Sequence, residues 1–400
     1  MRVLIINTLF PPHLFGGAER SVEELAHAVA ALGVDVTTLS LEPSGQRREV
    51  TGEIRSVYVP LRNLYWPYGE SQRPALLRKV WHAIDLYNPA MVRPVMAAIR
   101  AARPDVIHTN NLQGFSMSAW HAAARARTPV AHTLRDHYLS CARSTRFGGT
   151  DVCARTCASC VPFLLARRRA SVRVGAVVGV SRHILEQHLG LGFFPAATLT
   201  RVIHRAPPPV ADTAREAPRD PPIRLGFLGR LDPIKGIELL IRAVRARRDA
   251  RFELVVAGEG EREFVASLQA LADGAAVSFR GAVDGRRFLE DIDVLVVPSL
   301  WDEPSARVLL EAMAQAVPVI ASRRGGSPEL VEHGVSGLLF DPGQPASLDA
   351  ALTRIAEEPE LRAQLSRGAL ARAREAARAP LGRSYLELFE ELARVSRARG

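Results

Sequence analysis

The feature that most constrains the fold is a repeated alternation of short apolar runs with stretches of helical periodicity, broken once by a proline-rich segment. Such alternation is typical of βαβ units that build a parallel sheet. The first half is expected to hold strands within residues 2–7, 34–41, 106–107, 130–132, 176–180 and 199–203, and a helix at 19–32. Residues 206–222 are too rich in proline to form the interior of a strand or helix.

The same pattern restarts after this proline-rich segment. Strands are predicted at residues 223–228, 252–257, 277–279, 294–297 and 319–321, with helices at 237–248, 261–272, 286–292 and 305–316. A chain of 400 residues is long enough for two domains. We therefore expect two doubly wound α/β domains, residues 1–206 and 222–378, joined by a linker at 207–221 and followed by a last helix within 379–400. Two such domains would face a cleft lined by the carboxyl ends of their strands.

Composition narrows the class of partner. The chain is 47% apolar and 24% charged, and it has no apolar run near the ~20 residues that span a bilayer. We therefore expect a folded cytoplasmic protein. The net charge of +10 suits nucleic acid, anionic lipid or phosphorylated small molecules without choosing among them. Arginine is the usual cation, and Lys79 and Lys235 are the chain's two lysines.

A segment near residue 300 carries the strongest chemical signal. Glu303 is predicted in a loop, Pro304 in the first turn of a helix, and Glu311 about two turns along. The N-terminus of a helix favours a phosphate, and carboxylates accept hydrogen bonds from sugar hydroxyls. Arg307 in the first turn opposes the helix dipole unless an anion is nearby. The alternative is a surface helix with two solvated glutamates.

Three glycine-containing loops extend this signal. Gly325 and Gly326 precede a short helix and are expected to leave amide donors exposed to a ligand. Arg230 and Lys235 lie in the loop after the strand at 223–228, where a diphosphate would sit; otherwise the loop is solvated and its charges are incidental. Gly16 and Gly17 lie between the first strand and the first helix, without the spacing of a dinucleotide fingerprint. Individually each loop is a weak signal.

Together, and in this order and spacing, these motifs resemble glycosyltransferase family 4 over nearly the whole chain. The resemblance implies a GT-B fold of two Rossmann-like domains, with the C-terminal helix crossing back to the first. It also implies transfer of a sugar, with retained anomeric configuration, from a UDP- or GDP-sugar. The acceptor would be a glycan or lipid-linked molecule in cell-surface polysaccharide synthesis.

By the same resemblance Arg230 and Lys235 look like the diphosphate clamp and the main catalytic electrostatics. Glu303 resembles the residue that holds the transferred sugar, and Glu311 the one that binds the ribose. The remaining predicted donor-binding residues are Arg307, Gly325 and Gly326, and Gly16 and Gly17 in a loop that closes over the diphosphate. No catalytic metal is expected, because two cations already face the phosphates. Asp291 and Asp293 imitate a metal-binding D-x-D motif, and we interpret them as residues at a strand entrance.

This chain departs from the family pattern at three places. Ser305 and Ala306 stand where Phe-Gly is usual, and Ala316 stands where glycine is common. The histidine expected beside the sugar is replaced by Arg135. Either His132, Arg135 or His137 contributes in its place, or the acceptor chemistry differs. For each histidine the alternative is ordinary packing or solvation.

All four cysteines of the chain, Cys141, Cys153, Cys157 and Cys160, lie within twenty residues. Cys157 and Cys160 have the C-x2-C spacing that is common in structural zinc sites. The open alternatives are a closed zinc site and buried or regulatory thiols. Residues 167–169, three arginines beside Leu164 and Leu165, suggest peripheral contact with anionic lipid on the inner face of the membrane; a solvated helix face is the alternative.

Two other functions remain open at this point. A nucleotide-sugar 2-epimerase would use the same donor site without a sugar acceptor. A basic zinc module that binds nucleic acid would fit the charge and the cysteines, but the basic stretches lack interleaved aromatic residues. We therefore expect no nucleic-acid partner.

Overall fold

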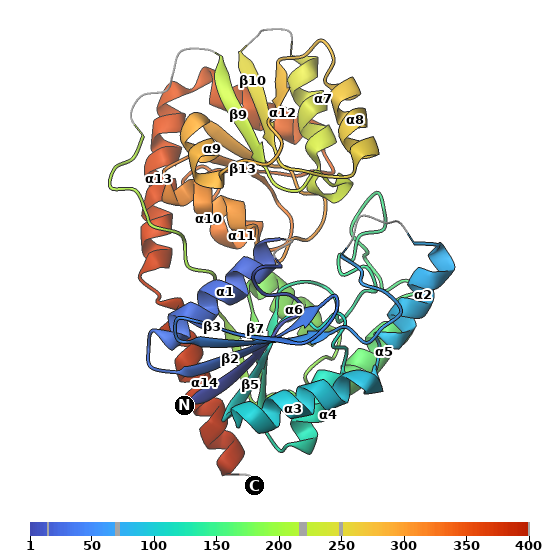
Figure 1. The fold of residues 1–400 in the computed structure, drawn as a ribbon. Helices are drawn as coiled ribbons and strands as arrows, with labels where there is room; N and C mark the ends of the chain where they lie inside the picture. Colours follow the sequence, from blue (N-terminus) through green and yellow to red (C-terminus); the bar gives the residue numbers. More distant parts are fainter. Residues whose placement is uncertain (14–15, 69–72, 216–221, 248–250, 399–400) are drawn as a thin grey trace. The chain divides into compact units, whose positions relative to one another are not determined.

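The computed structural model describes residues 1–13, 16–68, 73–215, 222–247 and 251–398, which form two compact units (Figure 1). Unit 1 comprises Met1–Arg146, Ala154–Arg205 and Pro380–Gly400, and unit 2 comprises Phe147–Cys153 and Ala206–Ala379. Within the predicted linker, Arg215 donates hydrogen bonds to the carbonyl oxygens of Leu289 at 2.6 Å and Ile292 at 2.5 Å. Residues 216–221 of that linker lie outside the described residues.

Unit 1 is built on an eight-stranded sheet in the order β3-β4-β2-β1-β5-β6-β7-β8. Its strands are β1 (Arg2–Ile6), β2 (Asp35–Glu42), β3 (Arg47–Thr51), β4 (Ile54–Pro60), β5 (Val106–Thr109), β6 (Val130–Leu134), β7 (Ala176–Gly179) and β8 (Leu199–Val202). Neighbouring strands are parallel except for the antiparallel pair β3 and β4. That pair was missing from the predicted strands.

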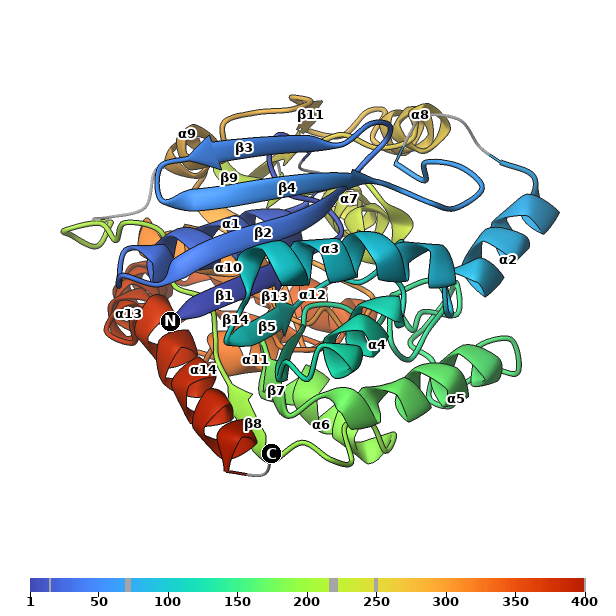
Figure 2. The same cartoon turned by 60° about the horizontal axis from the view of Figure 1, so that its bottom comes forward.

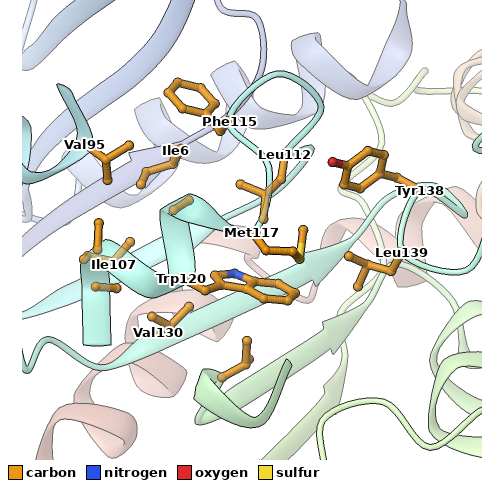
Figure 3. Close-up of a cluster of buried hydrophobic side chains, with 14 of the residues drawn as sticks. Ile6, Val95, Ile107, Leu112, Phe115, Met117, Trp120, Val130, Tyr138 and Leu139 are labelled. Atoms are coloured by element: carbon orange, nitrogen blue, oxygen red, sulfur yellow. The ribbon is translucent and has the colours of Figure 1, made fainter. Parts of the chain in front are cut away.

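Helices cover both faces of this sheet because its central strands are apolar on both sides. The helices of unit 1 are α1 (Gly17–Ala30), α2 (Ala75–Ile84), α3 (Val92–Ala102), α4 (Ser118–Arg125), α5 (Val161–Ala170), α6 (Arg182–Gly190) and α14 (Leu381–Arg397). In β1, Leu4 and Ile6 pack into one core cluster with residues of α3 and α4, which lie close together in Figure 2. Figure 3 shows Trp120 of α4 within this cluster. Val3 and Ile5 face the opposite core cluster.

The C-terminal helix α14 belongs to unit 1, as expected for the crossing helix. The hydroxyls of its Tyr385 and of Thr133 on β6 lie 3.1 Å apart, and the ring centroids of Phe389 and His108 lie 5.3 Å apart. Both aromatic side chains are buried in the core beside α1. Helix α14 thus completes the core of unit 1.

Unit 2 contains a parallel sheet in the order β11-β10-β9-β12-β13-β14. The strands are β9 (Ile223–Leu228), β10 (Phe252–Ala257), β11 (Val277–Phe279), β12 (Val294–Val297), β13 (Val319–Ser322) and β14 (Leu338–Phe340). The helices are α7 (Ile237–Ala246), α8 (Arg262–Leu271), α9 (Gly285–Asp291), α10 (Arg307–Ala314), α11 (Ser327–Leu330), α12 (Pro345–Glu357) and α13 (Pro359–Ala377). The prediction of two doubly wound sheets is confirmed.

The strand order reverses once in each sheet. In unit 2 the chain leaves β9 toward β10 on one side and returns to β12 on the other, and in unit 1 β1 lies between β2 and β5. Open α/β sheets bind ligands at the carboxyl ends of the strands beside such a reversal. A ligand site is therefore expected at the loops that follow β9 and β12. No described helix is long and apolar enough to cross a lipid bilayer.

Candidate functional site

In unit 2 the loops that leave β9 and β12 are locked together at the reversal point. Asp232 caps the turn at Pro233–Lys235 by accepting a hydrogen bond from the Ile234 N–H at 3.2 Å. Gly236 has a φ of +70°, and a Cβ there would lie 1.9 Å from the carbonyl oxygen of Pro298. The backbone N–H of Leu300 donates to the Ile234 carbonyl at 2.9 Å. Only glycine allows this close approach, which fixes the position of Lys235.

Lys235 and Glu303 form the centre of the arrangement. Lys235 Nζ lies 2.7 Å from Glu303 Oε1, and Ser299 Oγ donates to Glu303 Oε2 at 2.9 Å. Lys235 Nζ also lies 5.6 Å from the centroid of the Trp301 ring. The two charged side chains are 21% and 13% exposed. A lysine and a carboxylate with defined orientation thus meet where a ligand is expected.

Gly325 and Gly326 pack against the same loop. Gly325 has a φ of +55°, and a Cβ there would lie 2.1 Å from the carbonyl oxygen of Glu303. The Gly325 N–H donates to Asp302 Oδ1 at 3.2 Å, and the Gly326 N–H donates to the Glu303 carbonyl at 2.9 Å. The expectation that both amide donors are exposed for a ligand was therefore wrong. The two glycines hold the loop that carries Glu303.

The helix that carries Glu311 begins later than expected. Ala306 is the N-cap of α10, and Arg307 is its first residue, so Glu311 lies one turn into the helix rather than two. The backbone of Ala306, with φ −75° and ψ 101°, keeps the preceding residues out of the helix. Arg307 forms an ion pair with Glu311, four residues later on the same helix. The anion expected near Arg307 is therefore Glu311. Glu311 stays 22% exposed.

Arg230 lies in the loop after β9 and is the most accessible of the predicted donor-binding cations. Its side chain is 62% exposed and pairs with Asp232, with Nη2 2.9 Å from Oδ2. Exposed ion pairs contribute little free energy, typically about 0–1 kcal/mol. The guanidinium can therefore exchange this carboxylate for a phosphate.

In unit 1 polar residues line the carboxyl ends of three central strands. Asn7 follows β1, Asn110 and Asn111 follow β5, and Arg135 follows β6. The Asn111 N–H donates to Asn7 Oδ1 at 3.0 Å, and Arg135 Nε donates to Asn110 Oδ1 at 2.7 Å. Arg135 is half-buried, and this burial lowers the pKa of its guanidinium. Among the ion pairs of the described residues none includes Arg135.

The predicted glycine loop of unit 1 leads into α1. Gly16 is the N-cap with extended backbone, and the first helical residue is Gly17. The Gly17 carbonyl accepts from Ser21 Oγ at 2.6 Å and from Arg205 Nη1 at 3.3 Å. Residues 14–15 of this loop lie outside the described residues.

The two candidate histidines lie in the core of unit 1. His132 is 3% exposed, and its Nδ1 lies 2.9 Å from Thr109 Oγ1. Burial lowers the pKa of His132 to about 3, with the charges of His188 and Arg135 adding to the effect. His137 is fully buried, and its ring stacks on that of His188 with centroids 6.1 Å apart. This burial favours packing over direct contact with a substrate.

The cysteines are arranged unevenly. Cys141 and Cys160 are buried with their sulfurs 3.9 Å apart, Cys157 is exposed and Cys153 is intermediate. Cys157 Sγ lies 3.3 Å from Ser159 Oγ. In the described part of the chain no three His, Cys, Asp or Glu side chains are grouped closely enough to hold a metal ion. The zinc site stays a prediction.

Asp293 behaves as a strand-entry residue. Its Oδ2 accepts a hydrogen bond from the Arg224 N–H at 2.8 Å, and its own N–H donates to the Arg224 carbonyl at 2.8 Å. The carboxylate therefore links the starts of β9 and β12. This contact supports the structural interpretation of the D-x-D pattern.

Sequence reasoning missed the residues that orient the candidate side chains. Ser299 fixes Glu303, Asp302 binds Gly325, and Asn110 holds Arg135. Their positions in the sequence could have indicated two of these residues. Asn110 directly follows a buried strand, and Ser299 comes shortly after another. Polar residues at the carboxyl ends of parallel strands are positioned toward a ligand site.

Comparisons with known proteins now add to this geometry. Residues 16–205 match the family model "Glycosyl transferase 4-like domain", and residues 211–372 match "Glycosyl transferases group 1". A Klebsiella pneumoniae protein described as "Uncharacterized 42.6 kDa protein in cps region" is 31% identical over 332 residues, which cover 82% of this chain and 87% of that protein. This chain belongs to the family 4 type of glycosyltransferases.

Solved structures give the fold of this glycosyltransferase. It resembles the sucrose-phosphate synthase of Thermosynechococcus elongatus with a TM-score of 0.74 and 22% identity, over 98% of this chain and 99% of that one. It also resembles Anabaena HepE, solved in complex with UDP and glucose, with a TM-score of 0.70 and 20% identity, over 97% and 99% of the two chains. The glycosyltransferase therefore has the GT-B fold expected from its sequence.

Proposed function

We propose that this glycosyltransferase moves a hexosyl group from a UDP- or GDP-sugar to a glycan or lipid-linked acceptor, with retention of anomeric configuration. The observation that carries the proposal is the Lys235–Glu303 pair, which Ser299 orients at the reversal point of the unit 2 sheet. A compact ammonium suits a phosphate, and a fixed carboxylate suits a sugar hydroxyl. The donor's diphosphate and sugar would thus meet adjacent side chains.

Arg230 and Lys235 would bind the donor diphosphate together. Arg230 exchanges Asp232 for a phosphate oxygen, and Lys235 lies at the end of the same rigid loop. As the bond between sugar and diphosphate breaks, negative charge grows on the leaving group. Cations held in place before the reaction stabilise that charge without reorganising. These two residues therefore supply most of the catalytic electrostatics, and no catalytic metal is needed.

The two glutamates would hold the neutral parts of the donor. Glu303 accepts hydrogen bonds from hydroxyls of the transferred sugar, and its orientation is set by Ser299 and Lys235. Glu311, partly exposed and oriented by Arg307, accepts from the ribose hydroxyls. With the sugar held on one face, an oxygen of the leaving diphosphate can take the proton of the acceptor hydroxyl on that same face. The new bond then has the configuration of the old one.

The comparisons support the choice of donor and pathway. HepE, which shares the fold, was solved with UDP and glucose, and this favours a uridine nucleotide as the first donor to test. The Klebsiella relative is described by its cps region, which supports a role in polysaccharide synthesis. Peripheral contact with an anionic membrane is part of the same proposal.

The test is a transfer assay in excess EDTA with a panel of UDP- and GDP-sugars and glycan acceptors. We expect one donor to be consumed, and nuclear magnetic resonance of the product to show the anomeric configuration of the donor. An inverted product would contradict the retaining mechanism. Activity that returns only with Mg²⁺ or Mn²⁺ would make Asp291 and Asp293 candidate metal ligands. A parallel reaction without acceptor tests the rival 2-epimerase, which alone would form an epimerised nucleotide sugar there.

A further inference from the structure

Arg324 is a cation of unit 2 that lies beside the candidate donor site. It follows strand β13 and directly precedes Gly325, whose N–H donates to Asp302 Oδ1 at 3.2 Å. Gly325 and Gly326 pack against the backbone of Glu303, the residue proposed to hold the transferred sugar. The backbone of Arg324 is therefore fixed next to the loop that would hold the sugar.

The carboxylate that pairs with Arg324 is weakly held. Arg324 Nη2 lies 3.0 Å from Oδ1 of Asp151, which belongs to the part of unit 2 at Phe147–Cys153. The side chain of Arg324 is 21% exposed and that of Asp151 is 66% exposed. The same oxygen of Asp151 accepts from the Val152 N–H at 2.7 Å, so it keeps a partner when the arginine leaves it. An ion pair with so exposed a member contributes little free energy, and another carboxylate can replace Asp151.

Asp151 satisfies only part of the Arg324 guanidinium. The Nε–H of Arg324 is buried and has no hydrogen-bond acceptor among the described residues. Nε and Nη2 lie on the same edge of the guanidinium, and two donors on one edge can bind both oxygens of a single carboxylate. Asp151 contacts one of them, and the other stays unpaired. Because a buried unpaired donor costs free energy, this edge of Arg324 favours a ligand that contacts both.

Two further hydroxyls near these loops are buried without a described partner. Ser322 is the last residue of β13 and is fully buried, and Ser305 comes two residues after Glu303. The Oγ atoms of both are buried and unpaired among the described residues. Residues 322–326 contain two arginines and no acidic residue. The two loops are thus rich in donors and suited to a negatively charged group.

We propose that Arg324 binds a carboxylate of the transferred sugar, so that the donor is a nucleotide-linked hexuronic acid. The inference rests on the proposed function, because it names the sugar held by the same site. The sugar carboxylate replaces Asp151 and accepts from Nε and Nη2 together. It belongs to the donor and not to the acceptor, because Arg324 shares its loop with the glycines that pack on Glu303. A neutral hexose leaves the Nε–H unpaired and therefore binds more weakly.

The experiment is calorimetric titration of the full-length protein, without acceptor, with UDP and two pairs of donors. The pairs are UDP-glucuronic acid with UDP-glucose, and UDP-galacturonic acid with UDP-galactose. In one pair we expect the uronic acid to bind at least about tenfold more tightly than the neutral sugar, which corresponds to one charged hydrogen bond. If wild type binds GDP instead of UDP, GDP-mannuronic acid and GDP-mannose form the pair.

Two results separate this inference from the proposed function. A nucleotide that binds while its uronic acid donors bind no more tightly than the neutral ones would overturn the inference alone. No binding of either nucleotide would overturn the proposed function and the inference with it.

The variants assign the preference to Arg324. Arg324→Gln should abolish it without changing the affinity for UDP alone. Arg324→Lys should recover only part of it, because lysine keeps the charge but lacks the paired donors. Asp151→Asn should preserve the preference, because Asp151 competes with the sugar for the same guanidinium. If Asp151→Asn abolishes it at an unchanged melting temperature, the pair with Arg324 is itself required and the proposal is wrong.

The matched control is Arg323→Gln, which removes the same charge from the exposed neighbouring residue. This variant should bind every donor like wild type. Equal losses in Arg323→Gln and Arg324→Gln would mean that net charge alone acts. A weaker affinity of Arg324→Gln for UDP itself would assign Arg324 to the diphosphate. Either result would overturn the proposal.

Discussion

Arg135 is a half-buried cation to which the described residues bring no opposing charge within ion-pair distance. Its described hydrogen bond is to the amide oxygen of Asn110, a neutral group. A charge removed from water is costly unless a partner compensates it, so this site favours an anion from outside the chain. An arginine cannot transfer a proton at ordinary pH, which leaves positioning and charge stabilisation as its possible roles.

We therefore expect Arg135→Ala to reduce the transfer rate roughly ten- to hundredfold, which corresponds to the loss of one charged hydrogen bond. Donor affinity should change little, and Arg135→His should recover part of the rate. Transfer rates and donor affinities of both variants are compared with Arg125→Ala, which removes an exposed arginine from the end of α4. If Arg135→Ala transfers as fast as wild type, Arg135 has no role in the transfer reaction.

His132 gives a prediction about pH. Its pKa is about 3 in the folded protein, against about 6.5 in an unfolded chain. Between these values the unfolded chain binds a proton that the folded protein does not, so stability is lost as the pH falls below about 6.5. From pH 7 to pH 5 this histidine should remove about 2 kcal/mol. Urea unfolding at both pH values should show a smaller loss for His132→Gln, and an equal loss would contradict the burial.

At the level of elements, an unusual residue follows helix α10. Ala316 adopts a φ of +56°, and its N–H donates to the Met313 carbonyl at 3.0 Å, while the Val317 N–H donates to the Ala312 carbonyl at 2.9 Å. This left-handed position after a helix favours glycine, because a Cβ is strained there. The physical reason explains why glycine is common at this position in the family pattern.

Ala316→Gly should therefore stabilise the protein by about 0.5–1 kcal/mol. The matched control is Ala266→Gly in the exposed middle of α8, which should destabilise it by about 0.5–1 kcal/mol. Denaturant midpoints of the two variants should shift in opposite directions. A downward shift for both would mean that strain at Ala316 is relieved in some other way.

The segment with four cysteines gives a second prediction about an element. Two thiolates on one tetrahedral zinc with bonds of about 2.3 Å lie about 3.8 Å apart, and the sulfurs of Cys141 and Cys160 lie 3.9 Å apart. The zinc site predicted from the sequence also includes Cys153 and Cys157, although the described side chains form no group of three metal ligands. Elemental analysis of protein purified without added metal should find about one zinc per chain. Four titratable thiols and no zinc would leave only the thiol interpretation.

For the whole molecule, the sheets were predictable because buried parallel strands are short apolar runs. Such runs can be recognised in the sequence without knowing which strands pair. The hairpin β3–β4 was not, because β3 (Arg47–Thr51) is polar and only partly buried. The burial of Arg167 could not be predicted either, because it depends on Asp85 and Tyr138, which are distant in sequence. The loops of the candidate site could be predicted, because they follow the ends of strands. The pairing of Lys235 with Glu303 and of Arg307 with Glu311 became visible only in the structure.

The central claim is that unit 2 binds the diphosphate of a nucleotide sugar through Lys235 and its ribose through Glu311. Calorimetric titration of UDP and GDP into the protein tests it most directly, with Lys235→Ala and Glu311→Ala compared with Arg242→Ala and Glu263→Ala, which alter exposed residues of α7 and α8 in the same unit. We expect one nucleotide to bind wild type and both controls alike, and to bind the two site variants at least about tenfold more weakly at an unchanged melting temperature. Unchanged affinity in Lys235→Ala and Glu311→Ala, or no binding of either nucleotide to wild type, would contradict the account.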